Sequence, residues 1–363
     1  MAKQIDRWLL SMREMGGSDL HLTTGCPPKM RIHGDMKVLN EPVLTQERLA
    51  PILEEIVTPE QWKLFLKEHD LDFAYALPGY ARFRSNFLMQ YNGMGAVLRM
   101  IPDKVFTFEQ LGLPNTVLRF VELGFGLVVV TGPTGSGKTT TLASIIDYIN
   151  EHYSRHIITI EEPIEFVHPT KKSLISQREV HMHTHSFASA LRSAMRMDPN
   201  VVLVGEMRDP ETISLALSCA EMGVLVFGTL HTNSAAKTVD RIIDVFPAEE
   251  QPRIRTMLST SLSGGGVVAQ QLCRTADGKG RCAAFEILVG SPAMGSLIRQ
   301  GDTRKIQSTL EAGRSEGMQT MDWHLMELLK AGKISGQEAY QKAFTKQTFE
   351  QFWSPHGELA GKE

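Results

Sequence analysis

The stretch that decides the fold of this chain is 132–139, which reads Gly132-Pro133-Thr134-Gly135-Ser136-Gly137-Lys138-Thr139. This spacing of glycines, lysine and hydroxyl is typical of a loop that wraps phosphate groups with its backbone N–H donors. A β-branched run at 127–130 precedes the loop, and apolar residues at helical spacing follow it over 140–149. The alternative is a glycine-rich turn that arose by chance. Such a turn would not be expected to lie between a buried strand and a helix, whereas the phosphate-binding loop requires both. The stretch therefore predicts a site for a nucleoside triphosphate.

Within this loop the residue types suggest separate tasks. Lys138 is expected to reach the β- and γ-phosphates, and the hydroxyl of Thr139 is expected to hold Mg²⁺. The predicted cofactors are ATP and Mg²⁺. The predicted ATP-binding residues are Gly132, Pro133, Thr134, Gly135, Ser136, Gly137, Lys138, Thr139 and Thr140.

Composition argues against several classes of protein. The 363 residues are 42% hydrophobic and 22% charged, which is ordinary for a soluble protein of two or three domains. The net charge of −3 provides no electrostatic basis for binding nucleic acid, so no nucleic-acid partner is expected. Residues 1–6 lack the layout of a signal peptide, and no apolar run approaches the ~20 residues that cross a bilayer. Four cysteines without a CxxC pair indicate reduced thiols, so we expect a cytoplasmic protein.

The chain is expected to be an α/β protein in four regions. A small α+β domain covers 1–105, a linker covers 106–114, a P-loop ATPase domain covers 115–290, and a helical subdomain covers 291–363. Strands alternate with helices in the third region, which predicts a parallel sheet. Its expected core strands are 126–131, 156–160, 201–205 and 224–229. The first region is expected to hold helices over 5–15, 45–56 and 59–68 and strands over 19–22, 29–32, 81–87 and 95–100.

Acidic residues follow two of the expected core strands. Glu206 comes directly after the strand at 201–205, where a carboxylate beside the phosphate loop can order Mg²⁺ and its waters. Glu161, Glu162 and Glu165 follow the strand at 156–160 and could polarise an attacking water. Without the phosphate loop, these three acids would more readily be interpreted as a solvated acidic turn.

Histidines and arginines supply the remaining candidates. His231 ends the strand that begins at 224, where it could sense the γ-phosphate, although alone it would be interpreted as structural. The run 181–185 contains three alternate histidines, but no acidic or cysteine partner accompanies them, so incidental surface histidines are favoured over a metal site. Arg82, Arg84 and Arg99 lie in expected strands of the small domain. They could cap an exposed face, or they could neutralise charge in a transition state across a subunit boundary.

Taken in order, these blocks resemble the secretion ATPase superfamily and, within it, the type IV pilus retraction ATPases. The resemblance runs over nearly the whole chain and depends on many long, ordered matches. The matching blocks are 18–22, 27–28, 81–84, 132–139, 163–168, 176–180, 204–209, 227–232, 240–242 and 317–322.

The resemblance implies a PAS-like N-terminal domain joined to a RecA-like ATPase domain, assembled as a ring of six chains. It implies that Glu165, with Glu161 second, activates water, that Glu206 is the Walker B acid and joins Thr139 as a metal residue, and that His231 is the histidine of the His box. Arg84 and Arg99 match the arginine fingers of the family. The implied function is ATP-driven pilus retraction and twitching motility at the cytoplasmic face of the inner membrane. The implied partner is a membrane platform protein, and a second retraction ATPase is an optional further partner.

Four positions depart from the family pattern. Glu162 stands where the family has aspartate, and Val224 stands where the first histidine of the His box is usual. Residues 91–92 replace an arginine-containing turn, and 293–300 match the C-terminal signature of retraction only in part. Two alternatives remain open: a pilus extension or type II secretion ATPase, and an accessory paralogue that binds ATP but is mainly regulatory. Extension and type II ATPases usually carry a four-cysteine zinc module, whereas only Cys273 and Cys282 lie near its place here.

Overall fold

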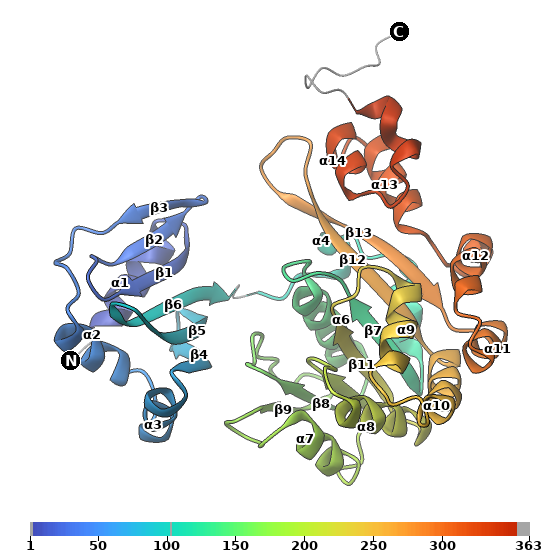
Figure 1. The fold of residues 1–363 in the computed structure, drawn as a ribbon, viewed down its shortest axis with the longest axis horizontal. Coiled ribbons are helices and arrows are strands. Elements are labelled where there is room, and N and C mark those ends of the chain that lie inside the picture. Colours follow the sequence, from blue (N-terminus) through green and yellow to red (C-terminus); the bar gives the residue numbers. More distant parts are fainter. Residues whose placement is uncertain (1–2, 102–103, 354–363) are drawn as a thin grey trace. The chain divides into compact units, whose positions relative to one another are not determined.

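The computed structural model describes residues 3–101 and 104–353 (Figure 1). It divides into two compact units. The first comprises 1–104 together with the short segment 162–167, and the second comprises 105–161 and 168–363. The end of the predicted helical subdomain, 354–363, lies outside the described residues.

The first unit is built on an antiparallel sheet of six strands, in the order β3-β2-β1-β6-β5-β4. The strands are β1 (Gly17–Thr23), β2 (Lys29–Ile32), β3 (Asp35–Val38), β4 (Asp70–Leu77), β5 (Ala81–Gln90) and β6 (Gly93–Ile101). The helices are α1 (Gln4–Glu14), α2 (Gln46–Glu54) and α3 (Pro59–Glu68).

Alternating side chains give this sheet one buried and one open face. In β5, Phe83 and Phe87 are buried, whereas Arg82 and Arg84 point to the other side of the strand. This period of two is what a strand requires when only one of its faces is covered. Helix α3 begins with a capping box in which Thr58 and Gln61 satisfy each other's backbone N–H groups.

The second unit is built on a sheet of seven strands, in the order β13-β12-β7-β11-β10-β8-β9. Neighbouring strands are parallel except for the hairpin of β12 and β13. The strands are β7 (Gly126–Thr131), β8 (His156–Glu161), β9 (Leu174–Glu179), β10 (Val201–Val204), β11 (Leu225–Leu230), β12 (Gly266–Arg274) and β13 (Arg281–Val289).

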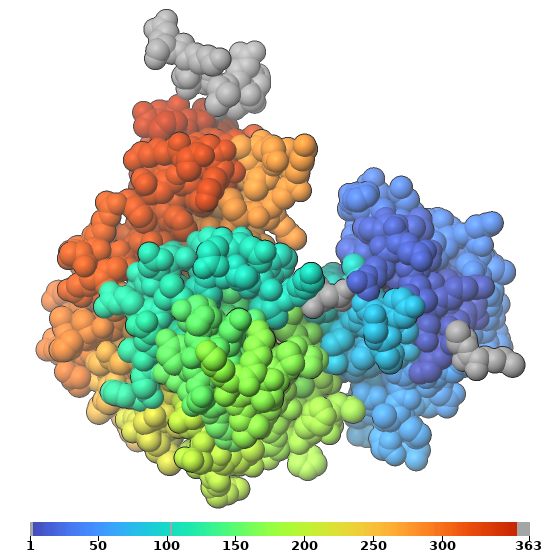
Figure 2. Space-filling model, turned by 180° about the vertical axis from the view of Figure 1, so that it is seen from behind, coloured from blue at the N-terminus to red at the C-terminus, as the bar shows by residue number. Residues whose placement is uncertain are grey.

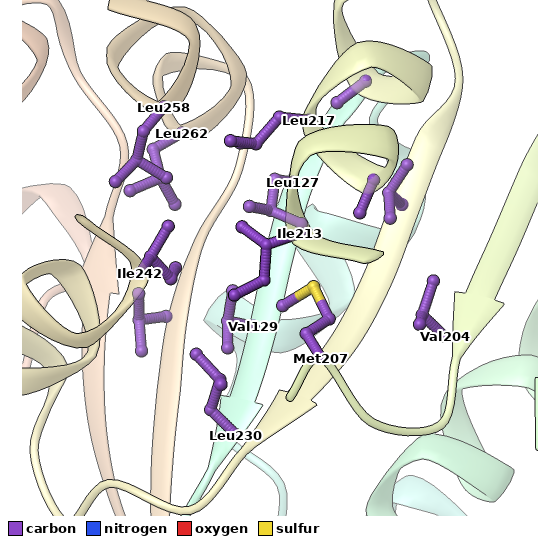
Figure 3. Packing of buried hydrophobic residues seen from close by; sticks show 14 of the residues in the cluster. Leu127, Val129, Val204, Met207, Ile213, Leu217, Leu230, Ile242, Leu258 and Leu262 are labelled. Atoms are coloured by element: carbon purple, nitrogen blue, oxygen red, sulfur yellow. The ribbon is translucent and has the colours of Figure 1, made fainter. Parts of the chain in front are cut away.

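Helices cover both faces of this sheet, so its central strands are buried throughout. Along β7, Leu127 and Val129 belong to one hydrophobic cluster, and Val128 and Val130 belong to another on the opposite face. Figure 3 shows Leu127 in the first cluster beside α8. The helices are α4 (Phe108–Leu111), α5 (Asn115–Glu122), α6 (Lys138–His152), α7 (Phe187–Ala194), α8 (Pro210–Glu221), α9 (Ala235–Asp244), α10 (Gln251–Ser263), α11 (Pro292–Gln300), α12 (Arg304–Ala312), α13 (Met321–Lys330) and α14 (Gly336–Lys342), with 3₁₀ turns at Gly313–Glu316 and Lys346–Phe352.

A buried carboxylate attaches two of these helices to the sheet. Glu286 of β13 accepts hydrogen bonds from the backbone N–H of Ala235 (2.7 Å) and of Met321 (3.3 Å), the first residues of α9 and α13. Burial raises the pKa of this carboxyl, and the two N–H donors oppose that shift. On the surface of this unit the β12–β13 hairpin (light orange) lies against the C-terminal helices (red) (Figure 2).

The predicted α/β class is confirmed, and the four expected core strands are present as β7, β8, β10 and β11. The prediction was incomplete elsewhere. It omitted β9 and the β12–β13 hairpin, which extend the sheet at its two ends, and it omitted β3 and β4 of the first unit. In β4 the apolar alternation of Leu71, Phe73 and Tyr75 was a usable signal.

Candidate functional site

The phosphate-binding loop connects β7 to α6. Strand β7 ends at Thr131, and α6 begins at Lys138 after Gly137, whose φ of 91° favours glycine. A Cβ at Gly132 would lie 2.3 Å from the backbone oxygen of Gln270, so a side chain has no room there. The chain thus turns tightly from a buried strand into the N-terminus of a 15-residue helix, where unpaired N–H groups favour an anion.

Gln270 of β12 holds this loop in place. Its side chain is buried, and its Nε2 donates to the backbone oxygen of Ser136 at 2.7 Å. Its Oε1 accepts from the hydroxyl of Thr141 at 2.8 Å, so one side chain connects the loop to the first turn of α6. Gln270 is absent from the predicted site residues. No local signal marks it, because its role depends on β12 lying beside β7.

Lys138 folds back over the loop. Its Nζ donates to the carbonyl oxygens of Gly132 (2.8 Å) and Pro133 (3.2 Å) and lies 3.4 Å from Nδ1 of His231. Burial lowers the pKa of Lys138, and the charge of Glu206 opposes that shift. An ammonium whose partners are neutral carbonyls and an imidazole is available to a stronger, negatively charged acceptor such as a phosphate.

Glu206 and His231 meet at the carboxyl ends of β10 and β11. Glu206 Oε1 lies 2.5 Å from Nε of Arg208 and 2.9 Å from Nε2 of His231. Burial alone would raise the pKa of Glu206, but Arg208 and His231 together bring it below its ordinary value, so the carboxylate is charged. Because an ammonium only donates, Nδ1 of His231 accepts from Lys138 and Nε2 donates to Glu206. A relay of lysine, imidazole and carboxylate therefore lies beside the loop.

Glu161 ends β8 and is buried. Its Oε1 accepts from the hydroxyl of Thr159 (2.7 Å) and from Nε2 of Gln177 on β9 (3.2 Å). These contacts hold the carboxylate against the sheet, so Glu161 is an anchored group at the same edge as Glu206.

Glu165 lies in the segment 162–167, which belongs to the first unit. Within that unit, Nη1 of Arg84 lies 3.3 Å from Oε1 of Glu165, and Nη2 of Arg82 donates to the backbone oxygen of Ile164 at 3.0 Å. Arg82 and Arg84, which lie on the same side of β5, therefore both contact the segment that holds the expected water-activating residue.

Arg99 of β6 has a different partner. Its Nε donates to Oδ1 of the buried Asp19 at 2.7 Å. Burial alone would raise the pKa of Asp19, but hydrogen bonds from Ser18 and Arg99 bring it below its ordinary value. The Arg99 side chain is otherwise well exposed, with 69% of its surface open to solvent.

Comparison with known families identifies the chain. A model of the type II/IV secretion system protein family matches residues 68–352, which is well over half of the sequence. The chain belongs to this family. The matched range contains the phosphate loop and every site residue predicted above, Arg84 and Arg99 included.

Among the relatives of this secretion-system protein are proteins of twitching motility. It is 51% identical to the twitching motility protein of Neisseria gonorrhoeae over 88% of this chain and 84% of that one. It is 50% identical to the type IV pilus retraction ATPase PilT of Pseudomonas aeruginosa over 93% and 97% of the two chains. A crystal structure of the pilus retraction motor PilT with bound ADP matches with a TM-score of 0.87 at 42% identity, covering 97% of this chain and all of that one. The Legionella pneumophila ATPase DotB matches with a TM-score of 0.82 at 30% identity, covering 93% and 94%.

The residues expected to hold Mg²⁺ in this secretion-system protein have suitable chemistry. The Thr139 hydroxyl and the charged Glu206 carboxylate are oxygen donors, which Mg²⁺ prefers. Over 3–101 and 104–353 no cluster of three or more histidine, cysteine, aspartate or glutamate side chains could hold a metal, and this includes the histidines of 181–185. Two protein oxygens suit Mg²⁺, because this ion is usually bound by one or two protein side chains together with the phosphates of a nucleotide.

The departure at Val224 lies away from this edge of the sheet. Val224 immediately precedes β11 and is buried, whereas His231 immediately follows the same strand. Seven residues of extended chain span about 23 Å at ~3.3 Å per residue. Val224 therefore packs in the core at the far end of β11 from the phosphate loop.

Two further features concern the cysteines and the helices. Cys273 and Cys282 are directly paired across the β12–β13 hairpin, and both are free thiols. Burial raises the pKa of Cys273 to about 12. Among the helices that the structure describes, none combines the length and the apolar character needed to cross a bilayer.

Proposed function

We propose that this chain is the ATP-hydrolysing motor that retracts a type IV pilus and so drives twitching motility. The observation that carries the proposal is its identity of 50–51% to named twitching and retraction proteins over 88–93% of its length. The phosphate loop and the relay of Lys138, His231 and Glu206 supply a site with suitable chemistry.

In the proposed reaction ATP binds with its phosphates in the loop 132–139 and Mg²⁺ at Thr139 and Glu206. Lys138 leaves its carbonyl partners for the β- and γ-phosphates, where its ammonium neutralises charge. The proton that His231 shares with Glu206 makes its imidazole responsive to the charge of the γ-phosphate, because Lys138 contacts the other ring nitrogen. Occupancy of the site is thereby coupled to the orientation of Glu206.

The roles of Glu165, Glu161, Arg84 and Arg99 are likewise proposed. Glu165 would orient and deprotonate the attacking water, with Glu161 as the second candidate, and Arg84 and Arg99 would neutralise the charge that develops on the phosphoryl group. Nη1 of Arg84 forms an ion pair with Oε1 of Glu165 at 3.3 Å. We propose that the site is activated when Arg84 leaves Glu165 and binds a phosphate of the nucleotide instead.

The proposed assembly is a ring of six identical chains with a PAS-like first domain and a RecA-like second domain. It would lie at the cytoplasmic face of the inner membrane and act on a platform protein at the pilus base. The proposal is supported by the likeness of the chain to the PilT and DotB ATPase structures over 93–97% of its length.

The experiment counts surface pili and scores twitching in a strain that lacks the gene. Complementation with the wild-type chain and with Lys67→Ala, an exposed lysine of the first unit, should restore motility, whereas Lys138→Ala should not. Excess pili without twitching is the expected phenotype of the deletion. Cells without pili would contradict retraction and indicate an extension ATPase.

The accessory paralogue is the second candidate, favoured by 37% identity to the type IV pilus ATPase PilU of Pseudomonas aeruginosa over 94% of the chain and by Glu162 in place of aspartate. Turnover of the purified protein separates the two. A motor hydrolyses ATP in a manner that Lys138→Ala abolishes, whereas a regulatory subunit binds ATP with negligible hydrolysis. Unchanged pilus number in the deletion strain would also favour the paralogue.

A further inference from the structure

A row of charged residues crosses the sheet of the first unit. In the register of the strands, Arg31 of β2 lies opposite Asp19 of β1, and Asp19 lies opposite Arg99 of β6. Arg84 of β5 lies opposite Arg99 in turn. Directly opposed residues have their side chains on the same face of a sheet, so all four belong to one face. One carboxylate is therefore placed in a row with three arginines.

Asp19 is set into this face as a buried carboxylate. Only 3% of its surface is exposed, whereas its neighbour Leu20 belongs to the hydrophobic core on the other face. A register shift between Gly17 and Asp19 adds one residue to β1, and the hydroxyl of Ser18 donates to Oδ2 of Asp19 at 2.6 Å. The other oxygen, Oδ1, accepts from Nε of Arg99 at 2.7 Å. Each carboxylate oxygen thus has its own donor, and the group is fixed in position.

The contact with Asp19 uses only one edge of the Arg99 side chain. A guanidinium carries five N–H donors in a planar fork, and Asp19 accepts the one at Nε. Within the residues that the structure describes, Arg99 makes no other hydrogen bond, and most of its side chain is exposed. Because the fork is rigid, an anchored Nε restricts where the terminal groups Nη1 and Nη2 can lie.

Arg84 is held differently. Its terminal Nη1 contacts Oε1 of Glu165 at 3.3 Å, so Arg84 must give up this carboxylate to bind a phosphate through that nitrogen. Arg99 is engaged through Nε, so it can keep Asp19 and still donate from both terminal nitrogens. Like charges that lie directly opposite each other are destabilising, and the carboxylate of Asp19 offsets this effect for Arg84 and Arg99.

We propose that Asp19 is a positioning residue for ATP hydrolysis, which holds Arg99 through Nε so that its terminal N–H groups face the phosphoryl group in the transition state. The inference rests on the role of Arg99 in the proposed function. An arginine that neutralises this charge accelerates phosphoryl transfer by about 10³- to 10⁵-fold, and a misplacement of about 1 Å costs ~10²-fold. An Arg99 that is present but no longer anchored should therefore lose part of its effect. The competing explanation is an ion pair that only joins β1 to β6.

The test measures steady-state ATP turnover of the full chain, with circular dichroism to show that each variant is folded. Asp19→Ala should lower kcat by about 10- to 100-fold. KM should change less than about 3-fold, because the charge that Arg99 neutralises develops in the transition state. Asp19→Asn keeps the volume and one neutral acceptor for Nε, so its kcat should lie between those of Asp19→Ala and wild type. Wild-type kcat in both variants would overturn the inference.

The matched control is Asp72→Ala. Asp72 is an exposed aspartate of β4 that lies opposite Asn86 on the same face of the sheet. Its removal should leave kcat within about 2-fold of wild type, as expected for an exposed position. A fall in kcat equal to that of Asp19→Ala would assign the effect to the charge of the whole face and would overturn the inference.

A double-mutant cycle separates positioning from a structural role. If Asp19 acts through Arg99, the double variant Asp19→Ala/Arg99→Ala should have the kcat of Arg99→Ala within about 2-fold. A further fall in the double variant that matches the fall in Asp19→Ala alone would show an independent structural role, and the inference would be wrong.

Two further outcomes distinguish this inference from the proposed function. Wild-type kcat in Asp19→Ala and Asp19→Asn, together with slow turnover in Arg99→Ala, would overturn the inference and leave the proposed function intact. Normal turnover in Arg99→Ala, with Lys138→Ala inactive, would overturn the role of Arg99 and the inference with it, although the chain would still be an ATPase.

Discussion

Replacement of Gln270 by leucine tests how far the phosphate loop depends on one buried side chain. The substitution keeps the approximate volume of the side chain. It removes the donor to the backbone oxygen of Ser136 and the acceptor for the hydroxyl of Thr141. Ser136 and Thr141 are both buried, so water does not replace the lost partners. A buried polar group left unsatisfied costs about 1–3 kcal/mol.

The two losses are unequal. The hydroxyl of Thr141 can rotate and donate to the backbone carbonyl one turn earlier in α6. The backbone oxygen of Ser136 cannot rotate to another donor in this way. We therefore expect the free energy of unfolding to fall by about 2–4 kcal/mol in total. The KM for ATP should rise at least 10-fold with a smaller change in kcat, because the loop that wraps the phosphates is no longer held.

Urea unfolding at one fixed protein concentration measures the first effect, and steady-state turnover measures the second. Gln300→Leu, an exposed glutamine on α11, is the matched control and should change the unfolding free energy by less than about 0.5 kcal/mol. Thr141→Val alone should cost about 1 kcal/mol, and combining it with Gln270→Leu should give less than the sum of the two changes. An unchanged unfolding free energy in Gln270→Leu, or full additivity, would refute the reasoning.

Three other outcomes are expected. Glu206→Gln should leave ATP affinity within a few-fold of wild type while turnover falls at least 100-fold, since the amide keeps the shape but loses the charge; parallel loss of binding in a filter assay would show a structural role instead. Phe87→Ala should lower the unfolding free energy by about 3–5 kcal/mol, because Phe87 is fully buried and packs edge-on against Phe73 with the ring centroids 4.9 Å apart. A change below about 1 kcal/mol in a urea titration would contradict the assigned core. Burial raises the pKa of Cys273 to about 12 from 9.0, so the stability that this protonated thiol contributes is complete below pH 9 and declines as the pH rises toward 12. Iodoacetamide at pH 8 should accordingly modify Cys273 over 100-fold more slowly in the folded chain than in urea, and equal rates by mass spectrometry would show that it is accessible.

Local sequence was sufficient for the elements that carry the phosphate loop. Strand β7 is a β-branched run, and the glycines after it adopt positive φ. Helix α6 begins at Lys138, the lysine that is predicted to contact the phosphates. These features depend on residues within one or two turns of chain. The family resemblance was confirmed for the same reason, because its blocks are contiguous motifs that need no tertiary contact to be recognised.

The strands at the edges of the seven-stranded sheet could not be predicted from local sequence. The residues of β12 and β9 become strands through pairing with β7 and β8, which are distant in sequence. Strand propensity is weak relative to such pairing, so a short apolar run is ambiguous until its neighbours are known.

The sequence by itself therefore determined the α/β class, the position of the phosphate loop and the family to which the chain belongs. Only the tertiary structure decided that Gln270 holds the loop, that His231 connects Lys138 to Glu206, and that Asp19 holds Arg99. The physical reason is the range of the interactions. Backbone conformation and periodicity are encoded within a few residues, whereas a hydrogen bond between side chains that are distant in sequence, 129 residues apart for Gln270 and Thr141 and 93 for Lys138 and His231, exists only after the strands of the sheet have paired.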